Sequence, residues 1–74
     1  MARLPVVSGR QLVRALEKTG YVVDRQKGSH IILRLTQPPF RRVTVPDHRE
    51  LAKGTLRAIL REVGLTSDAL VDLL

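Results

Sequence analysis

A histidine with basic neighbours is the part of this sequence best suited to chemistry. In the stretch QKGSHIILRL, His30 follows the Gly28–Ser29 pair, with Lys27 before it and Arg34 after it. Histidine has a reference pKa of about 6.5, so it can accept or donate a proton near neutral pH. The backbone amides of a Gly-Ser turn can face a phosphate, whose charge nearby cations would stabilise. The stretch therefore indicates acid–base chemistry at a phosphate, although a strand histidine is more often a hydrogen-bonded or solvated bystander.

RNA cleavage without a metal is the reaction that such a group would serve. The ribose 2′-OH must lose a proton to attack the adjacent phosphorus, and the 5′-oxygen must gain one. Cations must stabilise the extra charge that develops on the phosphorane. His30 can take one of the two proton-transfer roles.

Other chemical readings of these residues are weaker. His48, in PDHRE, is a secondary catalytic candidate, but its place between a strand-ending proline and a helix favours a loop or capping role. A metal site built on His30 and His48 would lack an i, i+4 pair and any cysteine, so no metal is expected. Ser29 is poorly placed as a nucleophile for His30, because adjacent strand residues point to opposite faces.

The charge of the chain is unevenly distributed. Residues 1–61 hold all 13 basic residues against four acidic ones, a net charge of +9, whereas residues 62–74 hold three acidic residues and no basic one. The electrostatic field of so many positive charges favours binding of a polyanion such as nucleic acid, or of an acidic protein partner. Ordinary solubilising charge is the plain alternative.

Length and composition limit the class of protein. Seventy-four residues are enough for one small domain, expected over residues 1–74. The absence of cysteine leaves no disulfide or thiolate metal site and suits a reducing cytoplasm. No apolar run is long enough to span a membrane, and the opening MARLPVVSGR lacks the apolar core of a signal peptide.

Helix signals occur near both ends of the sequence. Ser8 and Gln11 have capping-box spacing, and Gly20 stands where a helix would end. The run from Gly54 to a stop at Gly64 has an apolar stripe with helical spacing, and Thr66 is placed to cap a last short helix over 67–74. These patterns predict two main helices and a short one.

Three strands are predicted between the helices, over 21–27, 30–36 and 41–45. The Gly28–Ser29 pair reads as a hairpin turn and QPPF as a second turn. The order favours an α+β fold in which both main helices cover one face of an antiparallel sheet. Because strand side chains alternate between faces, the side chains that point towards the helices are expected to be Ile31, Leu33 and Leu35. His30, Arg34 and Arg42 are then expected on the outward face. The pattern does not settle the register of the first strand.

The expected phosphate contacts are basic side chains near this outer face and along the later helix, together with the hairpin turn. They are Arg25, Lys27, Gly28, Ser29, Arg34, Arg42, Lys53 and Arg57.

Three segments in this order resemble HicA-type toxins of toxin–antitoxin pairs. They are SGRQLVRALEKTGY, RQKGSHIIL and VTVPDHRELAKGTLRAIL, and the resemblance that they carry extends over nearly the whole length of the chain. The most specific elements are Gly28-Ser29-His30, Val45-Pro46-x-His48 and Lys53-Gly54-Thr55-Leu56. Each is weak alone, but their joint order and spacing make the resemblance specific.

The resemblance implies a fold similar to double-stranded RNA-binding domains and an mRNA interferase activity, which cleaves mRNA without metal or other cofactor. It places the family's catalytic histidine on His30 and implies a HicB-type antitoxin that covers this face. The rival hypothesis is a non-catalytic module that binds double-stranded RNA, and a third is a small structural component of a ribonucleoprotein. Only the first explains a histidine at the turn.

Overall fold

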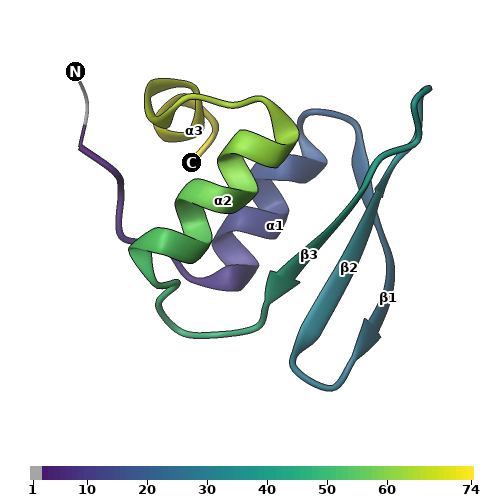
Figure 1. Cartoon of the computed structure of the whole chain (residues 1–74), viewed down its shortest axis with the longest axis horizontal. Helices are drawn as coiled ribbons and strands as arrows, with labels where there is room; N and C mark the ends of the chain where they lie inside the picture. Colours follow the sequence, from purple (N-terminus) through teal and green to yellow (C-terminus); the bar gives the residue numbers. More distant parts are fainter. Residues whose placement is uncertain (1–2) are drawn as a thin grey trace.

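Three helices and one sheet make up the computed structural model, which describes residues 3–74. The elements follow the predicted order (Figure 1): α1 Gly9–Glu17, β1 Tyr21–Lys27, β2 His30–Leu35, β3 Arg42–Pro46, α2 Lys53–Val63 and α3 Ser67–Leu73. The α+β class is therefore confirmed, with the helix, the three-stranded antiparallel sheet and the two later helices in sequence. No helix within residues 3–74 has the length and apolar character needed to cross a membrane.

The helix ends lie close to their sequence signals. The Ser8 hydroxyl accepts a hydrogen bond from the Gln11 amide at 3.0 Å, and the Gln11 side chain accepts one from the Ser8 amide at 2.8 Å, which completes a capping box. Helix α1 ends at Glu17, before Gly20, whose φ of 103° lets the chain turn into β1. Gly64 ends α2 in the left-handed conformation, and Thr66 caps α3, both as predicted.

The sheet has the order β1-β2-β3 with antiparallel pairing throughout. Ile31 lies opposite Val45, and Leu33 opposite Val43, and all four side chains are buried. His30, one residue before Ile31, is exposed and lies in register with Lys27 on β1 and Pro46 on β3. The predicted alternation of β2 and β3 is confirmed.

A β-bulge in β1 determines which face each of its side chains takes, which the sequence did not settle. Val23 pairs with Leu33, but Arg25 pairs with Ile32, so Asp24 is the extra residue. Beyond the bulge, Arg25 and Lys27 share the face of their outward partners on β2, which is the face of His30.

The hydrophobic core lies between the sheet and the helices. Figure 1 shows α1 and α2 on the same side of the sheet, with α3 across the end of the helix pair. The buried side chains are Val7, Leu12, Val13, Ala15, Leu16, Tyr21, Ile31, Leu33, Val43, Val45, Leu51, Leu56, Ile59, Leu60 and Leu70. Within residues 3–74 no helix covers the opposite face of the sheet, so side chains on that face meet solvent.

Gly9 allows α1 to begin in contact with the end of β3. It is buried, its amide donates to the His48 carbonyl at 2.9 Å, and a Cβ added to it would lie 1.9 Å from the Pro46 carbonyl oxygen. The first turn of α1 can therefore approach this backbone only because residue 9 has no side chain.

Gly9→Ala should lower the free energy of unfolding by about 2–3 kcal/mol, because backbone must move to admit the methyl group. Gly54→Ala is the matched control, since Gly54 is also in the first turn of a helix but a Cβ there meets no atom within 4 Å. The control should leave stability unchanged or raise it by up to about 1 kcal/mol. Equal urea midpoints for the two variants would contradict the close contact at Gly9.

Candidate functional site

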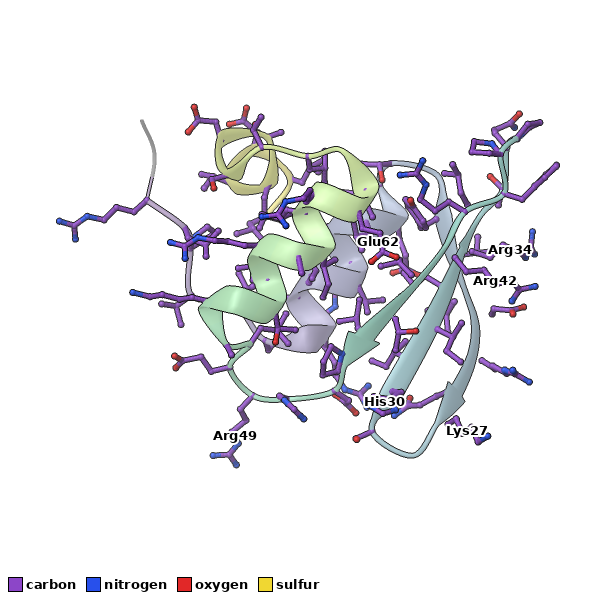
Figure 2. All side chains as sticks on the ribbon, in the orientation of Figure 1. Lys27, His30, Arg34, Arg42, Arg49 and Glu62 are labelled. Carbon is purple, nitrogen blue, oxygen red and sulfur yellow. The ribbon has the colours of Figure 1, made fainter. Side chains whose placement is uncertain are left out.

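His30 is presented at the end of the sheet by a tight two-residue turn. Gly28 and Ser29 connect Lys27, the last residue of β1, to His30, the first residue of β2. Gly28 has a φ of 60°, which L side chains rarely adopt, and Ser29 has no positive φ. This pattern is typical of a type II′ hairpin turn, which takes glycine at its first position. The turn therefore places Lys27 and His30 directly opposite each other on the outward face of the sheet (Figure 2).

The turn is held by the loop that follows β3. The Asp47 amide donates to the Ser29 carbonyl at 2.6 Å, and the Gln26 side chain donates to the Gly28 carbonyl at 3.1 Å. Both carbonyls of the turn thus have hydrogen-bond partners outside the hairpin ladder. His30 is exposed, but the backbone that carries it is anchored.

The Asp47 carboxylate lies where α1, β1 and the β3–α2 loop meet. Its two oxygens accept hydrogen bonds from Arg10 Nε at 3.1 Å and Arg10 Nη2 at 3.0 Å, and Oδ2 also accepts one from Gln26 Nε2 at 3.2 Å. The hydrogen bond from the Arg10 guanidinium is the main reason that the pKa of Asp47 lies below its usual value. Asp47 is therefore ionised at neutral pH.

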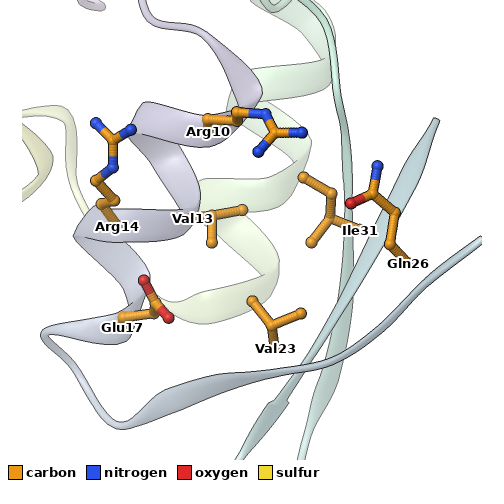
Figure 3. Close-up of a pocket in the computed structure, with 7 residues that line it drawn as sticks. All are labelled: Arg10, Val13, Arg14, Glu17, Val23, Gln26 and Ile31. Carbon is orange, nitrogen blue, oxygen red and sulfur yellow. The ribbon is translucent and has the colours of Figure 1, made fainter.

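A groove of about 290 Å³ runs between α1 and β1 beside this ion pair (Figure 3). Val13, Val23 and Ile31 form its apolar part, and Arg10 on α1 and Gln26 on β1 lie at its rim. Arg10 reaches from the helix towards the strand that carries Gln26 (Figure 3). The two side chains that bind Asp47 thus come from opposite walls of the groove.

Arg34 and Arg42 lie on the outward face as predicted, but towards the opposite end of the sheet from His30 (Figure 2). They are paired across β2 and β3, and Arg34 is four residues from His30, about 13 Å along a strand. Arg42 Nη1 donates to Asp24 Oδ2, and Arg34 Nε lies 4.0 Å from Asp24 Oδ1. Asp24, which sequence reasoning did not select, therefore offsets part of the positive charge of this pair.

Lys53 and Arg57 do not join the outward face of the sheet. Both are exposed residues of α2, which lies on the core side of the sheet, and Arg57 lines a shallow depression with Leu4 and Leu65. The structure thus divides the predicted phosphate contacts between the sheet face and the helix layer. Arg49, which the sequence analysis did not select, is exposed in the β3–α2 loop at the same end of the molecule as His30 (Figure 2).

His48 has a backbone role in the fold. The His48 carbonyl oxygen accepts a hydrogen bond from the Gly9 amide at the start of α1. His48 itself is exposed and lies in the loop between β3 and α2. This matches the predicted loop position near Asp47. Within residues 3–74, no three side chains of the His, Asp and Glu types come together in a group that could hold a metal ion.

The sequence was also compared with known proteins. No curated protein matches it. Residues 9–65 match the model of a protein family, the HicA toxins of bacterial toxin–antitoxin systems. The matched range runs from the first residue of α1 to the residue after the Gly64 cap, and it includes the hairpin turn, His30 and the loop that holds them. Because the match spans well over half of the 74 residues, this chain belongs to the HicA toxin family of bacterial toxin–antitoxin systems.

Proposed function

We propose that this chain is an mRNA interferase, an endoribonuclease that cleaves mRNA without a metal ion and uses His30 as general acid or base. The observation that supports this most directly is the placement of His30. It is exposed on an anchored turn, with Lys27 opposite it and Arg25 on the same face. A titratable group with cations beside it is what proton transfer at a phosphodiester requires.

The proposed reaction begins with the ribose 2′-OH. Neutral His30 accepts the 2′-OH proton as the oxygen attacks the adjacent phosphorus, or protonated His30 donates a proton to the departing 5′-oxygen. The P–O5′ bond breaks, which yields a 2′,3′-cyclic phosphate and a 5′-hydroxyl. His30 performs one of these two proton transfers, and water or another group performs the other.

The cationic residues would bind and neutralise the RNA backbone. Lys27 and the Gly28–Ser29 turn are nearest in the fold to His30 and would meet the phosphates beside the cleaved bond. Arg25 extends this contact along the face. Arg34 and Arg42 would exchange Asp24 for phosphate oxygens, and Lys53 and Arg57 would contact RNA that continues around the helix layer.

A toxin of this family has an antitoxin as its partner. We propose that this partner is a HicB-type protein that presents acidic or hydrogen-bonding groups to the cations around His30. Such contacts would block the substrate sterically. An mRNA substrate would also place the free toxin in the cytoplasm.

A non-catalytic module for double-stranded RNA is the second candidate. The cations that line the open sheet face, Arg25, Lys27, Arg34 and Arg42, would serve backbone binding equally well. The two candidates differ in whether the bound RNA is cut.

An RNA cleavage assay with the purified chain distinguishes them. We expect cleavage at neutral pH in the presence of EDTA, products with 2′,3′-cyclic phosphate ends by mass spectrometry, and suppression by the cognate antitoxin. Binding without cleavage would support the second candidate. Cleavage that stops on chelation and returns with added metal would overturn the metal-independent mechanism.

A further inference from the structure

Three segments that are distant in the sequence meet behind the turn that carries His30. Arg10 belongs to α1, Gln26 to β1, and Asp47 to the loop after β3. The Asp47 carboxylate binds both side chains, with distances of 3.0 to 3.2 Å. Its backbone amide reaches the Ser29 carbonyl at 2.6 Å. One residue therefore connects the helix, the hairpin and the third strand.

The β2–β3 ladder continues one residue past His30 and Pro46, to Ser29 and Asp47. His30 lies opposite Pro46 in a non-hydrogen-bonded pair, because hydrogen-bonded and non-hydrogen-bonded pairs alternate along an antiparallel ladder and the Ser29–Asp47 pair beside it is hydrogen-bonded. The next amide along the chain is that of Asp47, and it is this group that binds the turn at Ser29. Asp47 thus supplies the β2–β3 hydrogen bond adjacent to His30, and this bond reaches the turn that carries it.

The side chain of Asp47 adds a second route to the same turn. Gln26 Nε2 donates to Asp47 Oδ2 and also to the Gly28 carbonyl. The Asp47 carboxylate fixes Gln26, and Gln26 in turn holds Gly28. Arg10 occupies both carboxylate oxygens from the other side, so it limits the rotation of the Asp47 side chain.

We propose that Asp47 is a positioning residue for His30, which it holds in the orientation for proton transfer through the Gly28–Ser29 turn. This inference rests on the proposed function of His30 and adds a residue that touches neither the RNA nor the reacting atoms. The ion pair itself adds little to stability, because the Arg10 side chain is 64% exposed and only the Asp47 side chain, at 22%, is partly buried.

Kinetics of Asp47→Ala test the proposal. A displacement of about 1 Å in a catalytic group can cost 10²-fold in rate, so we expect kcat to fall by about 10- to 100-fold. KM should change by less than about threefold, because the cations that bind RNA remain. Asp47→Asn, which keeps a carbonyl oxygen in place, should lie between the wild type and Asp47→Ala. Asp72→Asn makes the same change in α3, far along the chain from the turn, and should leave kcat unchanged.

NMR spectroscopy tests the positioning without reference to activity. In Asp47→Ala, the imidazole signals of His30 should shift, and the residue 47 amide should exchange faster with deuterium. Gln26→Ala removes only the bridge to Gly28 and should shift the His30 signals in the same direction. The thermal midpoint should fall by less than about 5 °C in each variant.

The NMR and kinetic results together separate the positioning role of Asp47 from the proposed RNA cleavage by His30. Altered His30 signals in Asp47→Ala would support the positioning role even if the wild type cleaves no RNA, a result that would overturn only the proposed function. Unchanged His30 signals with a wild-type kcat would overturn the positioning role. If Asp47→Ala unfolds, a kcat per folded molecule equal to wild type in both Asp47→Asn and Gln26→Ala would overturn it as well.

Discussion

Replacing His30 with alanine should lower the rate of RNA cleavage by about 10² to 10⁴-fold, the usual contribution of a general acid or base. The fold should remain intact, because His30 is exposed and lies outside the buried core. Single-turnover cleavage of a labelled RNA measures the rate, and circular dichroism with thermal unfolding checks the fold. Growth arrest on expression of the toxin without its antitoxin should disappear in the same variant.

His48→Ala is the control for this experiment. It removes the other histidine of the chain, while the backbone carbonyl that binds the Gly9 amide remains. We expect a change of less than about threefold in cleavage rate, the size of effect typical of a surface substitution. If His48→Ala abolished cleavage in a folded protein and His30→Ala did not, the catalytic assignment would belong to His48.

An RNA with a 2′-O-methyl group at the cleaved nucleotide should bind but resist cleavage. Intramolecular attack by a well-placed group has an effective molarity of about 10⁵ M or more, far above the concentration of water. Loss of the 2′-OH nucleophile should therefore slow cleavage by at least about 10³-fold. Affinity should change little, because the expected contacts are mainly with the phosphates.

The matched control is the same RNA with the 2′-O-methyl group moved several nucleotides away from the cleaved bond. This RNA should be cut at the normal rate, which separates the loss of the nucleophile from an effect of the methyl group on binding. Gel electrophoresis of both substrates with wild-type protein makes the comparison. Cleavage of the first substrate at the normal rate would require a nucleophile other than the ribose.

Much of the fold follows from local patterns in the sequence. The Ser8–Gln11 capping box, the left-handed Gly64 and the Thr66 cap act within a few residues, so the helix ends are predictable. The alternation of buried Ile31 and Leu33 with exposed His30 is equally local, because strand side chains alternate between faces. The match of residues 9–65 to the HicA toxins confirms the predicted family.

The distribution of charge was less predictable, because it depends on how distant segments pack. The bulge at Asp24 turns Arg25 and Lys27 to the His30 face and places the Asp24 carboxylate against Arg42. Pattern alone does not place such an extra residue in a strand whose last four positions hold three charged residues and no apolar one. The sequence predicted that Lys53 and Arg57 lie on one helix. Their separation from the outward face of the sheet depends on which side of the sheet α2 covers.

The sequence by itself determined the order of the elements, the exposure of His30 and the flanking cations, because these depend on periodicity and turn chemistry within short windows. Only the tertiary structure decided what holds His30 in place. Arg10 and Asp47 are 37 positions apart, and Gln26 and Asp47 are 21 apart. Their contacts form because Gly9 lets α1 begin against Pro46, and because the register of β2 and β3 places Asp47 opposite Ser29. Hydrogen bonds between such distant residues depend on the packing of whole elements, which no local pattern encodes.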